Sequence, residues 1–379
     1  MSLASQIEFL RRLKTSRMVH GLGPQVPIDS PLIETTSFGS NPGALRMWSY
    51  VPPGLPAKAA LVVVLHGCGQ TAAGYEFGAG WSMLARRYGF ALLMPEQQKA
   101  NNPQGCFNWF NPEDIRRGHG EAASIRAMVE QMVRTHRLDR KRVFITGLSA
   151  GGAMSAVLLA TYPDVFSAGA VIAGLPYGVA HNVRQALHAM MSPATHSGPE
   201  LGDRVRHASH HQGPWPKLSV WHGSADRTVH PGNASQLVLQ WLDLHGVPAT
   251  SSEEGMVDGH ARRQWLNSDG DAVVESFTIA GMAHGTPLGV ADTGERFGSP
   301  GPFLLEAGIA SSYHIAKFFG LTGRIHLAVD AEPAPKQHHA GTTAQSAPDD
   351  QFAQHGAGRR SIDVAAVITK ALTAAGLIK

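Results

Sequence analysis

Residues 142–152, RVFITGLSAGG, contain the pattern that decides the fold: an apolar strand, a tight Gly-x-Ser-x-Gly turn and the start of a helix. In this turn Ser149 stands at the centre, with Gly147 two residues before it and Gly151 two residues after it. A strained strand-to-helix turn of this kind needs small residues at those positions, because the strand and the helix approach each other closely. The pattern therefore predicts a nucleophilic serine; an inert glycine-rich turn is the alternative.

Strands and helices alternate on both sides of this turn. The run ALVVVLHG at 60–67 is apolar almost throughout, as expected of a buried parallel strand. Further strands are expected at 46–52, 91–95, 142–147, 166–174, 218–223 and 272–281, and helices at 74–88, 119–136, 151–161, 233–244 and 303–319. This alternation predicts an α/β fold with a mostly parallel central sheet that is covered by helices on both faces.

The remaining segments indicate how the chain is divided. Residues 176–216 interrupt the alternation, are rich in His, Met and Ser, and are expected to form a lid-like insertion in a catalytic domain of residues 45–320. Residues 1–44 are expected to form an N-terminal extension, and the apolar spacing at its start suits an amphipathic helix. Residues 321–360 are expected to form a polar linker, and residues 361–379 a helix with one apolar side that docks.

The composition argues against several classes of protein. The 379 residues have a net charge of +3, with 43% hydrophobic and 16% charged residues, which is typical of a soluble globular protein and too weakly basic for a dedicated nucleic-acid binder. No apolar run approaches the roughly 20 residues that span a bilayer. The N-terminus lacks the features of a secretory signal, which favours a cytoplasmic protein. The sequence leaves the oligomeric state open.

The segment His66-Gly67-Cys68-Gly69-Gln70 follows the apolar strand directly. A serine nucleophile in an α/β-hydrolase takes one oxyanion N–H from the residue after the serine and another from such an early loop. We assign these two donors to the backbone N–H groups of Ala150 and Cys68. An ordinary glycine-rich connection is the alternative interpretation of the early loop.

The partners of Ser149 can be sought by chain order, because in this fold the acid and then the base follow the nucleophile. Asp226 comes just past the expected strand 218–223, and His284 comes just past the last expected strand. We therefore predict that Asp226 is the acid and His284 the base. Three other carboxylates are less well placed, since they lie in a helical pattern or before the last strand: Asp243, Asp269 and Asp271.

Several other histidines are interpreted differently. His222 and His230 bracket Asp226 but stand too close to it in sequence to be its base. His207, His210 and His211 lie in the polar insertion without carboxylates or cysteines at metal-ligand spacing, so a solvated surface is expected there and no metal site. No cofactor is expected either.

Three aromatic residues occur together in CFNWF at 106–110. Phe107, Trp109 and Phe110 are difficult to bury all at once, so we expect them to contribute to a substrate pocket. The alternative is that they pack in the core beside Cys106.

Together these motifs resemble the polyhydroxybutyrate (PHB) depolymerase-like esterase family of the α/β-hydrolases, which also includes feruloyl and acetylxylan esterases. The resemblance covers roughly residues 45–320 and is carried by HGCGQ (66–70), CFNWF (106–110), GLSAGG (147–152), WHGSADRTVHP (221–231) and GMAHGTP (281–287). It implies an α/β-hydrolase fold, a triad of Ser149, Asp226 and His284, and oxyanion donors at Cys68 and Ala150. The tail after residue 321 is short and polar compared with a polymer-anchoring domain, which argues against activity on crystalline polymer.

The expected reaction is ester hydrolysis through an acyl-serine. The expected substrates are short or oligomeric 3-hydroxyacyl esters, followed by aryl or acetyl esters of plant polysaccharides, as for a feruloyl or acetylxylan esterase. Two alternatives remain open: an acyltransferase that uses the same triad, and a catalytically silent protein that binds a polymer or carbohydrate.

The two cysteines bear on the compartment. Cys68 and Cys106 both follow strands of the expected parallel sheet at its carboxyl edge. We expect them to form a disulfide if the protein matures in an oxidising compartment, and to remain two packed thiols otherwise. The family resemblance favours an extracellular or periplasmic protein, in contrast to the N-terminus.

Overall fold

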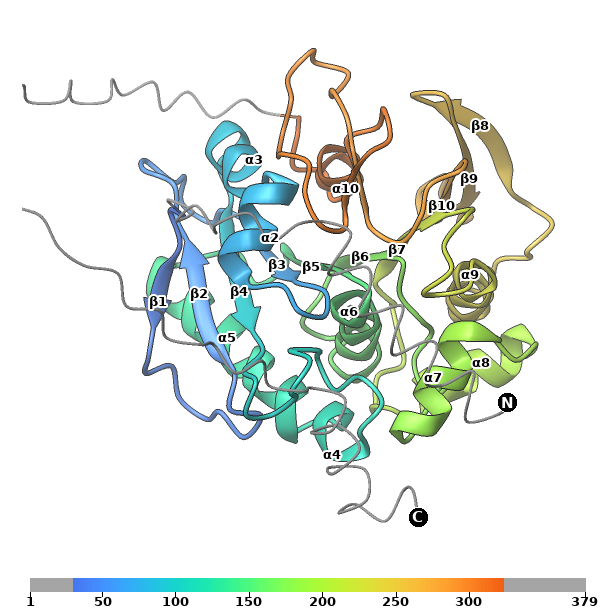
Figure 1. Ribbon diagram of the computed structural model, residues 1–379, viewed down its shortest axis with the longest axis horizontal. Coiled ribbons are helices and arrows are strands. Elements are labelled where there is room, and N and C mark those ends of the chain that lie inside the picture. The colour runs from blue at the N-terminus through green and yellow to red at the C-terminus, as the bar shows by residue number, and fades with distance from the viewer. Residues whose placement is uncertain (1–29, 324–379) are drawn as a thin grey trace, which may run out of the picture. The chain divides into compact units, whose positions relative to one another are not determined.

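The computed structural model describes residues 30–323 (Figure 1). The predicted N-terminal helix, nearly all of the predicted linker at 321–360 and the predicted C-terminal helix at 361–379 lie outside the described residues.

A ten-stranded sheet forms the centre of the described chain, in the order β1-β2-β4-β3-β5-β6-β7-β10-β9-β8. From β4 to β10 every neighbouring pair is parallel, and antiparallel pairs occur only toward the two edges. The strands are β1 (Ile33–Thr35), β2 (Arg46–Tyr50), β3 (Leu61–Leu65), β4 (Ala91–Glu96), β5 (Val143–Leu148), β6 (Ala168–Ile172), β7 (Lys217–Gly223), β8 (Glu253–Val257), β9 (His260–Leu266) and β10 (Ala272–Ile279). The prediction of a mostly parallel sheet is confirmed.

The apolar character of β3 follows from its position in the middle of this sheet. All five of its residues are buried. Leu61, Val63 and Leu65 belong to one core cluster, whereas Val62 and Val64 belong to a second one. Because successive side chains of a strand point to opposite faces, the two clusters are the cores on the two sides of the sheet.

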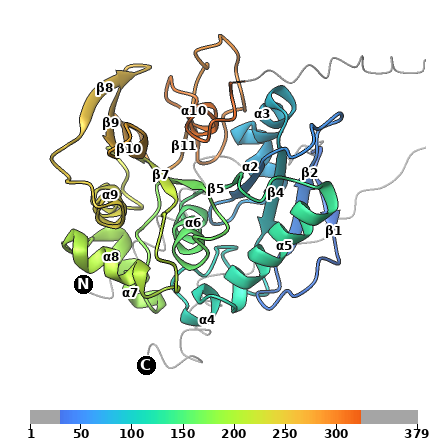
Figure 2. The ribbon, with the colours of Figure 1, turned by 180° about the vertical axis from the view of Figure 1, so that it is seen from behind.

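Helices cover both faces, as the alternation predicted (Figures 1 and 2). The first core includes side chains of α5 (Gly120–His136), α6 (Ala150–Thr161) and α9 (Gly232–His245). The second includes side chains of α2 (Ala72–Ala79), α3 (Trp81–Tyr88) and α10 (Ser311–Phe318). The short helix α4 (Pro112–Ile115) precedes α5.

Two expected helices differ from the structure. The single helix expected at 74–88 is broken at Gly80, whose φ is +72° and where a Cβ would lie 2.3 Å from the backbone nitrogen of Gly298. The helix expected at 303–319 is helical only in α10. Its first part is strand β12 (Leu304–Glu306), which pairs with β11 (Thr286–Leu288) in a separate two-stranded sheet.

The insertion contains two helices, α7 (Val183–Met191) and α8 (Gly198–Arg206). It is packed against α9, where the side chain of Gln240 donates to the carbonyl of Leu201 at 3.0 Å. It is also joined to the segment after β7, because the N–H of His230 donates to the carbonyl of Met190 at 2.7 Å. Among residues 30–323, no helix has the length and apolar character needed to cross a membrane.

Candidate active site

Ser149 occupies the turn between β5 and α6. Its φ of 57° and ψ of −118° are unusual for a residue with a side chain, so the backbone is strained at this point. Two backbone hydrogen bonds hold it there: the N–H of Ser149 donates to the carbonyl of Ile172 at 2.8 Å, and the N–H of Ala153 donates to the carbonyl of Ser149 at 2.9 Å.

The glycines on either side of Ser149 are required by close backbone approaches. A Cβ at Gly147 would lie 2.4 Å from the carbonyl oxygen of Gly151, and a Cβ at Gly151 would lie 2.4 Å from the carbonyl oxygen of Leu65. Since side chains do not fit at such distances, the Gly-x-Ser-x-Gly spacing follows from the packing of α6 against β5 and β3.

Asp226 and His284 are in direct contact. The Nδ1 atom of His284 lies 2.7 Å from Oδ2 of Asp226, while Oδ1 of the same carboxylate accepts hydrogen bonds from the N–H groups of Thr228 and Val229 at 2.8 and 2.9 Å. The carboxylate can only accept, so Nδ1 of His284 donates and Nε2 is left free to accept a proton.

Three parallel strands bring the three predicted triad residues to one edge of the sheet. Ser149 follows β5, Asp226 follows β7 and His284 follows β10, each at the carboxyl end of a parallel strand. The loops of Asp226 and His284 also contact each other, because the N–H of Ala225 donates to the carbonyl of Met282 at 3.0 Å. Within the described residues, Oγ of Ser149 makes no hydrogen bond. Catalytic hydrogen bonds are often long without substrate and shorten in its complex.

His222 is a second histidine on the Asp226 carboxylate, and the sequence interpretation missed this contact. Its Nε2 lies 2.8 Å from the carbonyl oxygen of Val229 and 3.3 Å from Oδ2 of Asp226. Burial would raise the pKa of Asp226, but the hydrogen bonds from His222 and His284 and the charge of His284 hold that pKa well below its ordinary value. The Asp226 carboxylate is therefore ionised at neutral pH.

The two predicted oxyanion donors lie on adjoining backbone segments. The segment at 66–70 lies against the start of α6, since a Cβ at Gly151 would be 2.5 Å from the carbonyl oxygen of His66. Within residues 30–323, neither the N–H of Cys68 nor that of Ala150 donates to another group. Both donors are thus available to a ligand.

Cys68 and Cys106 form a disulfide with their Cα atoms 4.2 Å apart. The bond joins the segment at 66–70 to the aromatic segment at 106–110. Bonds of this kind persist in oxidising compartments.

A buried polar network lies behind these two segments and was not predicted. The side chain of Gln97 donates to Oε1 of Glu121 at 2.5 Å, and the N–H of Asn108 donates to Oε2 at 2.9 Å. The N–H of Gln97 donates to Nε2 of His66 at 3.1 Å, so Nδ1 of His66 donates to the carbonyl of Gly67. Burial raises the pKa of Glu121 to about 8. This network could not be predicted from the sequence pattern, because a glutamate such as Glu121 is an ordinary polar residue of a helix.

The aromatic residues differ in exposure. Phe107 is fully buried and its ring lies 4.9 Å from that of His66, whereas Trp109 is 6% exposed and packs edge-on against the half-buried Phe110. The burial of Phe107 and of most of Trp109 favours the core-packing alternative for these two residues, and the contribution of the three aromatic residues to a substrate pocket stays a prediction. Phe107 and Trp109 both belong to the same core cluster as buried residues of α5 and α6.

His207, His210 and His211 of the insertion do not belong to a metal-binding group within residues 30–323. In the described part of the chain, no group of three or more His, Cys, Asp or Glu residues has the geometry of a metal site. The ring of His211 instead contacts the carbonyl of Pro214 at 2.8 Å and the ring of Trp215.

Comparison with known proteins relates this arrangement to esterases. Residues 45–263 match the model of the family described as Esterase PHB depolymerase. The chain is 45% identical to poly(3-hydroxyalkanoate) depolymerase C of Paucimonas lemoignei over 77% of this chain and 70% of that protein. It is 34% identical to feruloyl esterase B of Neurospora crassa over 68% and 88%. A solved acetyl xylan esterase from Aspergillus awamori has a TM-score of 0.65 at 23% identity, covering 76% of this chain and 99% of that one, and supports the α/β-hydrolase fold.

Proposed function

The chain belongs to the esterase PHB depolymerase family, and we propose that it hydrolyses carboxylic esters with Ser149 as nucleophile, His284 as general base and Asp226 as the acid that orients the histidine. The observation that carries this proposal is the hydrogen bond between Nδ1 of His284 and Asp226, at the same edge of the sheet as the strained turn of Ser149. The catalytic domain would comprise residues 45–320, with residues 176–216 as an insertion.

The proposed mechanism has two steps. In the first, Oγ of Ser149 forms a bond to the ester carbonyl carbon while Nε2 of His284 takes the hydroxyl proton. The carbonyl oxygen becomes an oxyanion that accepts from the N–H groups of Cys68 and Ala150. The carbon–oxygen bond to the alcohol then breaks, and His284 returns the proton to the departing alkoxide. Water attacks the acyl-serine in the same way and releases the acid.

The environment of Asp226 supports this use of His284. An ionised carboxylate on Nδ1 fixes the ring with Nε2 unprotonated, and it stabilises the imidazolium that forms when Ser149 loses its proton. Because Asp226 is held by two backbone N–H groups and by His222, the carboxylate has a fixed orientation before substrate binds.

The proposed substrates are short or oligomeric 3-hydroxyacyl esters. Support comes from the relative named poly(3-hydroxyalkanoate) depolymerase C, which is 45% identical to this chain, compared with 34% for the relative named feruloyl esterase B. Aryl and acetyl esters of polysaccharides are the second class to test.

An ester panel tests the substrate class. The purified chain would be assayed on 3-hydroxybutyrate dimers and trimers, on short and long p-nitrophenyl esters, on methyl ferulate and on acetylated xylan. We expect the highest kcat/KM on the hydroxybutyrate oligomers. A higher value on the ferulate or the xylan would move the chain to the second class. Products would be measured with and without an added alcohol, because a preference for alcoholysis over hydrolysis would indicate an acyltransferase.

A further inference from the structure

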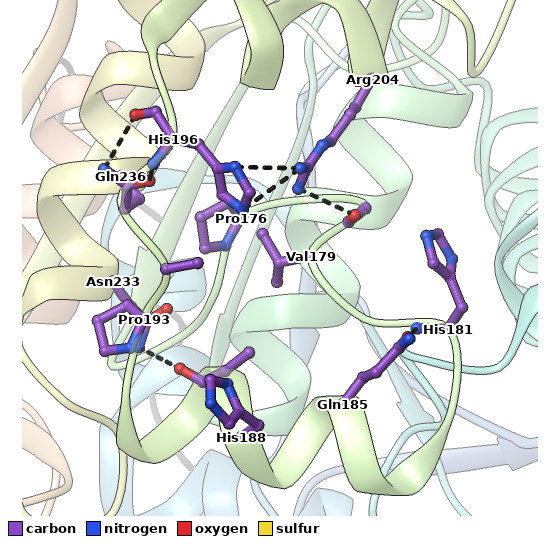
Figure 3. A pocket seen from close by; sticks show the side chains of 13 residues that line it. Pro176, Val179, His181, Gln185, His188, Pro193, His196, Arg204, Asn233 and Gln236 are labelled. Atoms are coloured by element: carbon purple, nitrogen blue, oxygen red, sulfur yellow. Dashed lines mark hydrogen bonds between the residues drawn. The ribbon is translucent and has the colours of Figure 1, made fainter.

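A cavity of about 300 Å³ lies within the insertion and is separate from the triad (Figure 3). Its walls come from the start of the insertion, from α7 and α8, and from the first turns of α9. No residue assigned to the triad or the oxyanion hole lines it. Its volume is at the lower end of the range found for small-molecule sites.

Arg204 gives this cavity its charge. The half-buried guanidinium donates through Nη1 to the carbonyl of Gly178 at 3.1 Å, and its Nη2 lies 3.3 Å from both ring nitrogens of His196. Only one ring nitrogen of an imidazole can accept from Arg204, and no carboxylate of residues 30–323 lies within ion-pair distance of the guanidinium. Figure 3 shows Arg204 and His196 directed toward each other at one end of the cavity. The remaining N–H groups of Arg204 are left for another acceptor.

Glu200 is an acidic side chain whose charge reaches Arg204, but it makes no direct ion pair with the guanidinium. Glu200 lies 4.0 Å from Nδ1 of His196, and it accepts from the backbone and side chain of Ser197 at the start of α8. His181 and His188 also line the cavity, and none of its lining residues is acidic. A guanidinium that makes no direct ion pair keeps N–H groups with which it can bind an anion.

The other walls are apolar and indicate what the anion carries. Pro176, Val179, Ala189 and Pro193 face the same space. A guanidinium binds a carboxylate through two parallel hydrogen bonds, and the apolar wall suits a short carbon chain attached to it. The combination favours a small aliphatic carboxylate over a bare inorganic anion.

The cavity is connected to the active site through the backbone. A Cβ at Gly174 would lie 2.9 Å from the carbonyl carbon of Gly152, one turn from Ser149, and Pro176 follows two residues later. Helix and chain dimensions put Pro176 on the order of 15 Å from Ser149. On the other side, Asn233 lines the cavity and donates to the carbonyl of Ala189 at 3.0 Å, seven residues after Asp226.

We propose that this cavity binds the carboxylate of a short hydroxy acid, either as the free end of an oligoester whose scissile bond lies at Ser149 or as the released acid product. The inference rests on the proposed hydrolysis of 3-hydroxyacyl oligomers. Arg204 is the charged contact, and the apolar wall holds the terminal unit. The enzyme would thereby prefer oligomers that have a free carboxyl end.

The test compares 3-hydroxybutyrate trimer that has a free carboxyl end with the same trimer as its terminal methyl ester. We expect a kcat/KM about tenfold higher for the free acid, as for loss of one charge-assisted hydrogen-bonded contact. Arg204→Gln should abolish this preference mainly through KM, and Arg204→Lys should restore part of it. Arg184→Gln is the matched control, because it removes the same charge from the exposed side of α7 and should keep the preference.

A binding arm distinguishes the two sources of the carboxylate. If free 3-hydroxybutyrate raises the Tm of the Ser149→Ala chain and 3-hydroxybutyramide does not, the acid product binds in the cavity. If the trimer with a free carboxyl end raises the Tm and free 3-hydroxybutyrate does not, the end of the oligomer is the ligand. Equal kcat/KM for the two trimers, together with no carboxylate-dependent rise in Tm, would overturn the inference, and this comparison needs only wild type and Ser149→Ala. Absence of hydrolysis of both trimers, with other esters cleaved, would instead refute the proposed substrate class.

Discussion

Asp226→Asn is the substitution whose outcome the geometry determines most fully. The side chain has two oxygens with different partners: Oδ1 accepts from two backbone N–H groups, and Oδ2 accepts from His284 and His222. An asparagine keeps one oxygen only. The two backbone donors would hold that oxygen in the Oδ1 position, so the amide NH₂ would face Nδ1 of His284.

This reversal has a defined chemical effect. An NH₂ group donates, so Nδ1 of His284 must accept and the ring proton moves to Nε2, which can no longer take the proton of Ser149. We expect kcat to fall on the order of 10⁴-fold, the loss seen for the same exchange in another serine hydrolase. This corresponds to roughly 5 kcal/mol of transition-state stabilisation.

The assay is the hydrolysis of a saturating short p-nitrophenyl ester at pH 7.5, with folding of each variant checked by circular dichroism. Asp258→Asn is a matched control, because Asp258 also bonds a histidine, with His314 Nε2 at 2.8 Å from its Oδ2, away from the triad. That variant should keep kcat within about twofold, as expected for a residue outside the chemistry. A folded Asp226→Asn chain with kcat within tenfold of wild type would refute the reasoning.

Three further predictions concern the surroundings of the site. Glu121 has a pKa of about 8 in the fold against 4.5 for the free side chain, so the folded state binds the proton more tightly and the free energy of unfolding should fall as pH rises from about 4.5 to 8. Glu121→Gln should flatten this pH dependence of the free energy of unfolding, measured by urea titration. An unchanged pH dependence in the variant would contradict the raised pKa of Glu121. Reducing Cys68–Cys106 should lower the free energy of unfolding by about 4 kcal/mol for a separation of 38 residues and should lower kcat, whereas unaltered unfolding and kcat in dithiothreitol would argue against a role for the bond. Phe110→Ala should change the ratio of activities on aryl and alkyl esters. Phe107→Ala should lower the free energy of unfolding by about 3–5 kcal/mol without changing that ratio. A changed ratio in Phe107→Ala and an unchanged ratio in Phe110→Ala would indicate that Phe107 lines the substrate pocket.

The parts of the fold that could be predicted are those where burial determines the residue types. The apolar runs of β3 and β5 identify central strands, because both of their faces are covered by helices. The hairpin of β8 and β9 was not predicted, since Trp265 is the only buried residue of the two strands and the sequence therefore has no apolar run there. Residues 303–319 have helical spacing in their apolar residues, but Leu304 packs against Gly78 and its strand pairs with β11.

The candidate site likewise has contacts that could be predicted from the sequence and contacts that could not. Chain order led to the prediction of Asp226 and His284 as acid and base, and the structure places these two side chains in contact; their roles stay a prediction. The contacts of His222 and Glu121 depend on which residues burial brings together, and neighbours in sequence do not reveal them. His222 was set aside as a base, although its four-residue spacing from Asp226 was the signal of a contact. For Glu121, no comparable signal exists in the sequence.

The central claim is that Ser149 carries the acyl group, and labelling by a fluorophosphonate probe tests it most directly. The probe reacts with a serine that is activated by a base, and mass spectrometry of the digested protein identifies the residue. We predict one label, on the peptide that contains Ser149, with labelling lost in Ser149→Ala and strongly slowed in Asp226→Asn. A label on another residue, or ester hydrolysis by Ser149→Ala at more than a tenth of the wild-type kcat, would contradict the account.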